Sequence, residues 1–305
     1  MKKTIKFLVS LLIILGVIVF NNLSVQADSV KVSAPQNVKA SVSGVTNAKI
    51  KWDNVEGAKK YTIYRATSKK GKYKKVGASK TNSFKNKSLT RGKTYYYKVV
   101  ANGENKNSKK SDYAKVKILT KKQVLKKIRN ALKDKKWVKN NVKMKCSVFD
   151  SKIEGKQILY FGKIKNKELV AIEAVSEQDY SVQMFLVGYN NGKIIATSST
   201  EKPMHYFHGG PSIDLNKGIA AIGSLNHGYM YEKYFKVSNV KFNDLDTFED
   251  NEGAMDGNTF FELNGKKVSK KKYQKAFNKY TKYKIASLQF NGYKLTSNNI
   301  DKYIK

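Results

Sequence analysis

The stretch LTRGKTYYYKVVA, residues 89–101, decides the fold of the first part of the chain. In it Tyr95, Tyr97 and Val99 fall at every second position, which is the period of a β-strand with one buried face. Trp52 and Tyr61 lie in two further runs with the same alternation, and turn residues separate such runs at intervals of about 8 to 12 residues. The pattern predicts an antiparallel β-sandwich over residues 34–119.

The same region resembles a fibronectin type III domain. Four features occur in the expected order: PQNV at 35–38, Trp52, YTIYR at 61–65 and LTRGKTY at 89–95. The resemblance implies that Trp52 and Tyr61 are core residues and that the hydroxyl of Tyr95 holds the corner before the sixth strand to nearby backbone. Arg91 stands where many members have proline. In bacterial exported proteins the module implies a spacer or binding role without catalytic residues.

The first 27 residues have the three features of a secretory signal peptide, in order. Lys2, Lys3 and Lys6 form a positive start, residues 7–20 are apolar, and VQA at 25–27 is a small-residue cleavage site. The alternative is an uncleaved membrane anchor, but the apolar run is shorter than the roughly 20 residues that an apolar helix needs to span a bilayer. We therefore expect cleavage after Ala27 and a secreted, extracellular or cell-wall-associated protein without a membrane span.

The chain is strongly basic, with 60 Lys and Arg against 23 Asp and Glu and a formal charge of +37. Lysine supplies 57 of those 60 basic residues. Because base recognition and bidentate phosphate recognition favour arginine, we predict no specific nucleic-acid partner. Two interpretations remain: retention on an anionic cell-wall polymer or another polyanion, and a solvated surface with a compositional lysine bias. A single cysteine, Cys146, excludes an intramolecular disulfide, and an exported chain of this kind suits a Gram-positive bacterium.

Residues 120–305 predict a second domain of the α+β class. Thr120 can cap an amphipathic helix over 121–140, and Ser269 can cap a last helix over 270–282. Between them we expect a meander sheet over 143–263, with strands at 143–149, 157–164, 168–175, 182–189, 193–198, 218–225, 229–237 and 258–263. The predicted fold class is therefore all-β plus α+β: a fibronectin type III β-sandwich followed by a meander-sheet domain bracketed by two helices.

The layout of this second domain is similar to a C-terminal α+β domain of exported clostridial surface proteins. Residues 159–170 and 260–269 have that similarity. Where the family has an aspartate-rich, calcium-like loop, this chain has Lys163, Lys165 and Lys167, which cannot ligate calcium. The resemblance implies no particular activity, and we predict no cofactor.

Three histidines are the candidate metal ligands. His205 and His208 are separated by two residues, and His227 is the third. On a strand the first two would point to opposite faces, so a shared zinc requires a turn or helix there, and we predict partly buried histidines without a metal. Six of the 23 acidic residues lie between Asp244 and Asp256. Their spacing fails the calcium-hand pattern, so we interpret the stretch as a solvated acidic loop, with ion binding by an irregular loop as the alternative.

No nucleophile elbow, phosphate loop or zinc-protease helix occurs in the sequence, so we predict no catalytic residue and a non-enzymatic protein. The favoured function is binding or adhesion at the cell surface, with retention on an anionic wall polymer by the lysine charge. The alternative is an accessory or degenerate hydrolase-type protein whose second domain binds glycan or peptide. That alternative expects a pocket lined by aromatic residues around Tyr206, Phe207 and Tyr229.

Overall fold

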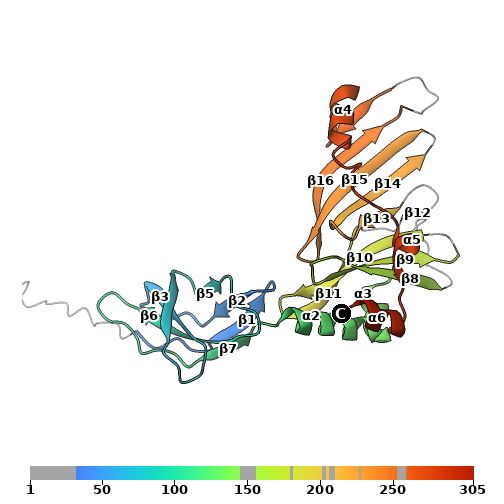
Figure 1. The fold of residues 1–305 in the computed structure, drawn as a ribbon. Coiled ribbons are helices and arrows are strands. Elements are labelled where there is room, and N and C mark those ends of the chain that lie inside the picture. Colours follow the sequence, from blue (N-terminus) through green and yellow to red (C-terminus); the bar gives the residue numbers. More distant parts are fainter. Residues whose placement is uncertain are drawn as a thin grey trace, which may run out of the picture.

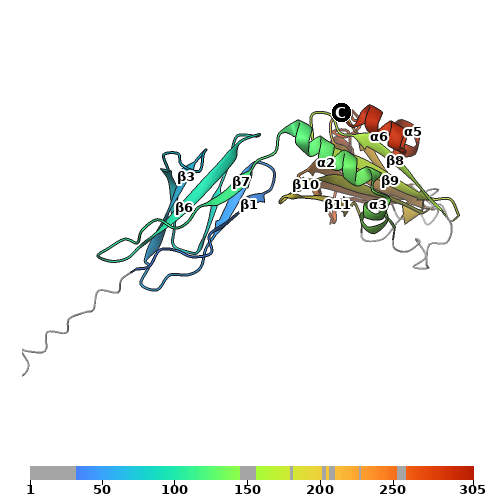
Figure 2. The same ribbon diagram turned by 90° about the horizontal axis from the view of Figure 1, so that it is seen from below.

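The computed structural model describes residues 32–144, 156–178, 181–200, 204–205, 210–226, 228–252 and 259–305. Two domains follow one another along the chain, a smaller all-β domain and a larger domain of sheets and helices (Figures 1 and 2). Within the described residues no helix is long and apolar enough to cross a membrane. The predicted signal peptide, residues 1–27, lies outside the described residues.

The first domain is a sandwich of two antiparallel sheets, with strand orders β1-β2-β5 and β4-β3-β6-β7. The strands are β1 (Lys39–Ser43), β2 (Asn47–Lys51), β3 (Lys60–Ala66), β4 (Lys74–Ser79), β5 (Ser83–Asn86), β6 (Thr94–Asn102) and β7 (Ala114–Lys117). The pairing of β2 with β5 and of β3 with β6 links strands far apart in the sequence and closes the core. This arrangement confirms the expected antiparallel β-sandwich.

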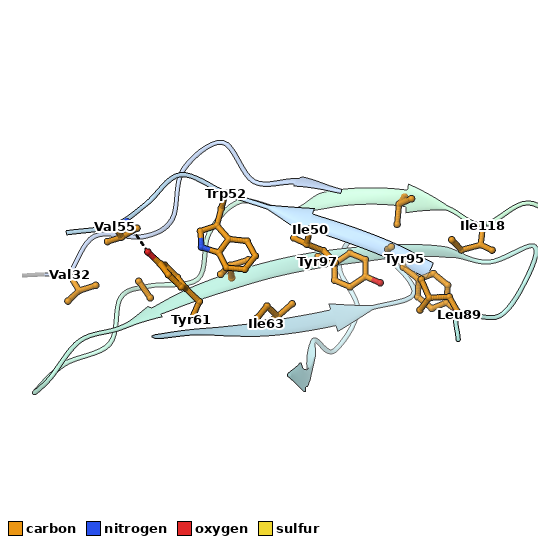
Figure 3. Packing of buried hydrophobic residues seen from close by; sticks show 14 residues of the cluster. Val32, Ile50, Trp52, Val55, Tyr61, Ile63, Leu89, Tyr95, Tyr97 and Ile118 are labelled. Carbon is orange, nitrogen blue, oxygen red and sulfur yellow. Dashed lines mark hydrogen bonds between the residues drawn. The ribbon is translucent and has the colours of Figure 1, made fainter. Parts of the chain in front are cut away.

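Trp52, Tyr61 and Tyr95 lie buried in the core of this sandwich (Figure 3). The rings of Trp52 and Tyr61 meet edge to face with their centroids 5.2 Å apart. The Tyr61 hydroxyl accepts a hydrogen bond from the backbone N–H of Val55 at 2.9 Å, and the Tyr95 hydroxyl accepts one from the N–H of Thr90 at 2.9 Å. Each tyrosine therefore fills the core with its ring and satisfies a backbone amide with its hydroxyl.

The second domain begins with two helices in place of the single one expected over 121–140. Thr120 caps α2 (Lys121–Lys133) through a reciprocal capping box. Asp134 ends this helix and caps α3 (Lys135–Asn141), because its side chain accepts two backbone N–H groups of α3. Apolar residues recur on both sides of this elbow, which is why the periodicity alone predicts one continuous helix.

The sheet next to these helices, which we call the proximal sheet, has the strand order β11-β10-β9-β8-β19. Its strands are β8 (Gln157–Lys163), β9 (Leu169–Ser176), β10 (Ser181–Asn190), β11 (Lys193–Ser198) and β19 (Tyr293–Lys294), and β12 (Met204–His205) also pairs with β10. All of β9 and nearly all of β10 are buried. Both faces are therefore covered, one by α2, α3 and α6 (Ser297–Tyr303) and the other by a second sheet.

This second sheet, the distal sheet, has the order β13-β14-β15-β16-β17-β18. Its strands are β13 (Pro211–Asp214), β14 (Ile219–Asn226), β15 (Tyr229–Ser238), β16 (Lys241–Asp250), β17 (Phe261–Leu263) and β18 (Lys266–Lys267). It rises steeply from the proximal sheet (Figure 1), and a common core joins the two. Its far face packs on α4 (Lys270–Phe277). The expected meander is thus divided into two sheets with helices as the outer layers.

The acidic stretch that we interpreted as a solvated loop is largely strand β16. Its pairing with β15 contains a β-bulge: Lys233 pairs with Thr247 and Phe235 with Asp244, so β16 has one residue more than its partner. Because of the extra residue, Asp244 lies on the same face as Lys233, whereas Asp246 lies on the face covered by α4. The interpretation of this stretch as a solvated loop was therefore wrong, because most of it pairs with β15 as a strand.

Two of these acidic side chains accept hydrogen bonds from buried tyrosines. The hydroxyl of Tyr273 donates to Asp250 at 2.5 Å, and that of Tyr280 donates to Asp246 at 2.6 Å. Burial alone would raise the pKa of Asp246, but the hydrogen bonds that it accepts outweigh burial and lower this pKa. Tyr280 lies beyond the end of α4, so the helix is shorter than the expected 270–282 although its predicted apolar face is buried.

Glu173 is a fully buried acid on β9. The hydroxyl of Ser287 donates to its carboxylate at 2.8 Å and the N–H of Gln289 donates at 3.0 Å, so the carboxylate holds the start of α5 (Leu288–Asn291). Burial raises the pKa of Glu173 above its ordinary value of 4.5, and the hydrogen bonds from Ser287 and from the backbone oppose this only in part.

The substitution Glu173→Gln should therefore remove a pH dependence of stability. Because the folded pKa is raised, the stability that Glu173 contributes is fully present below pH 4.5 and is lost as the pH rises through the folded value. Gln does not titrate, so the unfolding free energy of the variant should rise relative to that of the wild type as the pH increases above 4.5. Urea unfolding across this range measures the difference, and parallel pH profiles would contradict the prediction.

The two domains meet at a short junction between β7 and α2. The N–H of Gly44 donates to the side-chain oxygen of Asn191 at 2.7 Å, and the N–H of Asn191 donates to the carbonyl of Gly44 at 3.2 Å. Arg91 forms an ion pair with Glu168 at 2.8 Å. Arg91, the departure from the fibronectin type III pattern, therefore links the first domain to the second.

Candidate functional site

Five exposed lysines surround one groove of the second domain, which we call the lysine groove. It has a volume of about 590 Å³ and lies between α2 and α3 on one side and β8, β19 and α6 on the other. The lysines are Lys133, Lys135, Lys139, Lys156 and Lys294. They make up five of the 14 lining residues, against 57 of 305 residues in the chain, so the groove holds about twice the average share of lysine.

The helix elbow brings three of these lysines together. Because Asp134 breaks the helix, Lys133 at the end of α2 lies near Lys135 and Lys139 of α3 at the mouth of the groove. The other wall is fixed by β19, which pairs with β8 and continues through Leu295. A sheet edge and a helix elbow therefore hold lysines from distant parts of the sequence around one groove.

The floor of the lysine groove is apolar. Leu132 and Ile300 are almost completely buried there, and the other apolar lining residues are partly exposed. These are Val138, Ile158, Leu159 and Leu295. Lysine stems can pack along such a surface while the ammonium groups stay in water at the rim.

Among the described residues, positive charge at the groove exceeds negative charge. Asp301 pairs with Lys133 and, at 3.9 Å, with Arg129. Within the described part of the chain, no acidic residue forms an ion pair with Lys135, Lys139, Lys156 or Lys294. Like charges that share a groove repel one another, and a bound anion relieves that repulsion. The arrangement therefore favours a ligand with several negative charges.

None of the five groove lysines was among the site residues predicted from the sequence. Lysine is spread along the whole chain, so no local enrichment marks these positions. Asp134 is the residue in the sequence that could have indicated the groove. Aspartate is common at helix N-caps, and Asp134 stands between two lysines in the middle of the periodic apolar pattern. It indicates a bend, but the sheet wall of the groove comes from residues distant in the sequence.

Most residues of the possible aromatic pocket and most of the candidate metal ligands lie outside the described part of the chain. Tyr206, Phe207, His208, His227 and Cys146 lie outside the described residues. The backbone of His205 pairs with Ser181 in β12. Among the described residues no group of His, Cys, Asp and Glu is arranged to hold a metal ion. The expectation of a chain without a metal site stays a prediction.

Tyr229, the remaining residue of the predicted pocket, lies at the start of β15 with 40% of its surface exposed. Its hydroxyl donates to Glu249 at 2.9 Å, and this hydrogen bond raises the pKa of Tyr229. Its ring contacts that of Phe260, with centroids 5.8 Å apart. Tyr229 thus belongs to an exposed aromatic face of the distal sheet and does not line the lysine groove.

No protein-family model matches the chain, and no curated protein matches it. Among solved structures, it is similar to an Fn3-like protein from Clostridium thermocellum, with 23% identity over 28% of this chain and 90% of that chain and a TM-score of 0.26. The fn3 domain of human collagen alpha-1(XX) chain has 16% identity over 32% of this chain and 94% of that chain, with a TM-score of 0.26. A β-1,2-glucanase from Parabacteroides distasonis has 26% identity over 33% of this chain and 15% of that chain, with a TM-score of 0.27. We transfer no activity from these proteins.

Proposed function

We propose that this chain is a secreted or cell-surface binding protein whose lysine groove holds an anionic cell-wall polymer. The observation that supports this is the gathering of Lys135, Lys139, Lys156 and Lys294 around one groove without an acidic partner among the described residues. The proposal includes export by the predicted signal peptide and a Gram-positive origin. It treats the first domain as a spacer and the chain as a binding protein without catalytic activity.

The chemistry of lysine suits this ligand. A flexible polymer with repeated phosphates offers many single negative charges, and hydrated ammonium groups bind these without a fixed bidentate geometry. Each phosphate that a lysine neutralises releases condensed counterions, so affinity falls as the salt concentration rises. Binding through the lysine groove should therefore depend steeply on salt.

The first test is binding of the chain from Asp28 to purified cell wall, with and without its teichoic acid, across a salt series. We expect strong binding at low salt that disappears when teichoic acid is removed or when the salt concentration is raised. Equal binding to both wall preparations, or binding that does not change with salt, would contradict the proposal.

Charge-neutralising variants then separate the groove from the general surface charge. Four groove lysines are changed to Gln: Lys135, Lys139, Lys156 and Lys294. The matched control changes four exposed lysines at the far end of the domain: Lys266, Lys267, Lys271 and Lys272. The groove variant should lose at least about tenfold in affinity, and its salt dependence should flatten by about one unit of slope for each phosphate that is no longer neutralised. Equal losses of affinity in the two variants would show that diffuse charge, and not the groove, binds the polymer.

A further inference from the structure

A second cleft opens between the end of β11 and the face of β15 and β16 that carries Lys233, and we call it the aromatic cleft. It has a volume of about 460 Å³. Residues 197–200 form one wall, and residues of β14, β15 and β16 form the other. It shares no lining residue with the lysine groove. The aromatic cleft is therefore separate from the lysine groove.

Aromatic rings form much of the second wall. Tyr231, Lys233 and Phe235 fall at every second position of β15, so all three point to the cleft. Tyr229 continues this row toward the start of the strand. Phe242 of β16 meets Phe235 edge to face with centroids 5.7 Å apart. Phe235 is buried, whereas Tyr231 and Phe242 are partly exposed and leave ring surface open to a ligand.

Hydrogen-bond donors and acceptors surround these rings. Lys233 Nζ lies 3.0 Å from Asp244 Oδ2, on the same face as the aromatic row. On the opposite wall, the hydroxyl of Ser198 donates to the carbonyl of Thr200 at 2.7 Å. The hydroxyl of Ser199 is buried and has no hydrogen-bond partner within the described residues. The cleft thus offers donors and acceptors together, and Asp244 disfavours a polyanion.

We infer that the aromatic cleft binds a neutral oligosaccharide. A sugar ring has an apolar C–H face that packs on an aromatic ring, and its hydroxyls both donate and accept hydrogen bonds. Tyr231 and Phe242 supply the ring surfaces, Lys233 donates, Asp244 accepts and the Ser199 hydroxyl can do either. This site does not depend on the lysine groove or on its ligand.

The test is calorimetric titration of the chain from Asp28 with soluble neutral hexamers of glucose, N-acetylglucosamine, mannose and galactose. The titrations are made in about 0.5 M NaCl, where binding through exposed charges is screened. We expect saturable binding of at least one hexamer, with the same affinity in the four-lysine groove variant. The absence of binding to all four hexamers would overturn the inference.

Two variants place the binding in the cleft. Tyr231→Ala and Asp244→Asn should each lower the affinity at least about tenfold, which corresponds to about 1.4 kcal/mol. The Asp244 side chain is 68% exposed, so its substitution should leave the thermal unfolding unchanged and test the site without altering the fold. The control is Tyr113→Ala, an exposed tyrosine of the first domain. If both cleft variants bind as tightly as the control, the cleft is not the binding site and the inference is wrong.

Discussion

Phe248→Ala is expected to lower the free energy of unfolding of the second domain by about 3 to 5 kcal/mol. The ring is fully buried between the distal sheet and the layer of α4. Four other rings have centroids within 6 Å of it: Tyr234 at 5.9 Å, Tyr273 at 5.5 Å, Phe277 at 5.2 Å and Tyr280 at 5.7 Å. Its removal leaves a cavity that these rigid neighbours cannot fill and also ends four edge-to-face contacts.

Urea unfolding followed by circular dichroism measures this loss. The matched control is Leu245→Ala on the same strand, because 41% of the Leu245 side chain is exposed and its truncation should cost less than about 0.5 kcal/mol. Similar losses for the two variants would show that the α4 layer contributes little to the stability of the domain.

Trp52→Ala is expected to lower the unfolding free energy of the first domain by about 3 to 5 kcal/mol. Only 3% of Trp52 is exposed, and its ring packs against Tyr61 in a core that the second domain does not share. The buried residues of the two hydrophobic clusters belong to different domains, although the partly buried Val42 of β1 packs against both, so we expect each domain to show its own unfolding transition. The Trp52 variant should shift one transition and the Phe248 variant the other.

The positions of the two tryptophans make this measurable by fluorescence. Trp52 lies in the first domain and Trp137 on α3 of the second, so Trp137→Phe leaves a probe of the first domain alone. In the Trp52→Ala variant the remaining fluorescence reports the second domain, and calorimetry follows both transitions. Lys51→Ala, an exposed neighbour, is the control. A single transition that both core variants shift equally would contradict the independence of the two cores.

The first domain could be predicted from the sequence because its signals are local. The alternation at Tyr95 and Tyr97 describes one strand, and the partner of the Tyr95 hydroxyl, the N–H of Thr90, is five residues away. Trp52 and Tyr61 follow the same period and lie in neighbouring parts of one core. A short window of sequence therefore contains the information that fixes their positions.

The helices of the second domain could be predicted, but their ends could not. Periodicity reports which residues are buried, and it reports Tyr280 correctly although this residue lies beyond the end of α4. At Asp134 the periodicity continues while the backbone turns, because an N-cap side chain satisfies the amides of a new helix.

The acidic strand β16 was interpreted as a loop for a physical reason. A carboxylate buried in a strand is costly unless a partner compensates for its lost hydration, and such partners are not visible locally in the sequence. Asp250 and Asp246 accept from Tyr273 and Tyr280, which lie 23 and 34 residues further along the chain. The lysine groove could not be predicted for the same reason. Lys156 and Lys294 are far apart in the sequence, and the pairing of β8 with β19 brings them to one groove.

The β-bulge of β16 lets the two ends of one strand change independently. In a strictly alternating strand, inserting or deleting a residue exchanges the roles of all positions on one side of the change. Here the extra residue near Leu245 divides β16 into two parts. Before it, Phe242 and Asp244 line the aromatic cleft. After it, Asp246 and Phe248 face the α4 layer. Substitutions of the residues that line the aromatic cleft before the bulge therefore leave the α4 core after it intact, whereas loss of the extra residue would move the residues on one side of the bulge to the opposite face of the sheet.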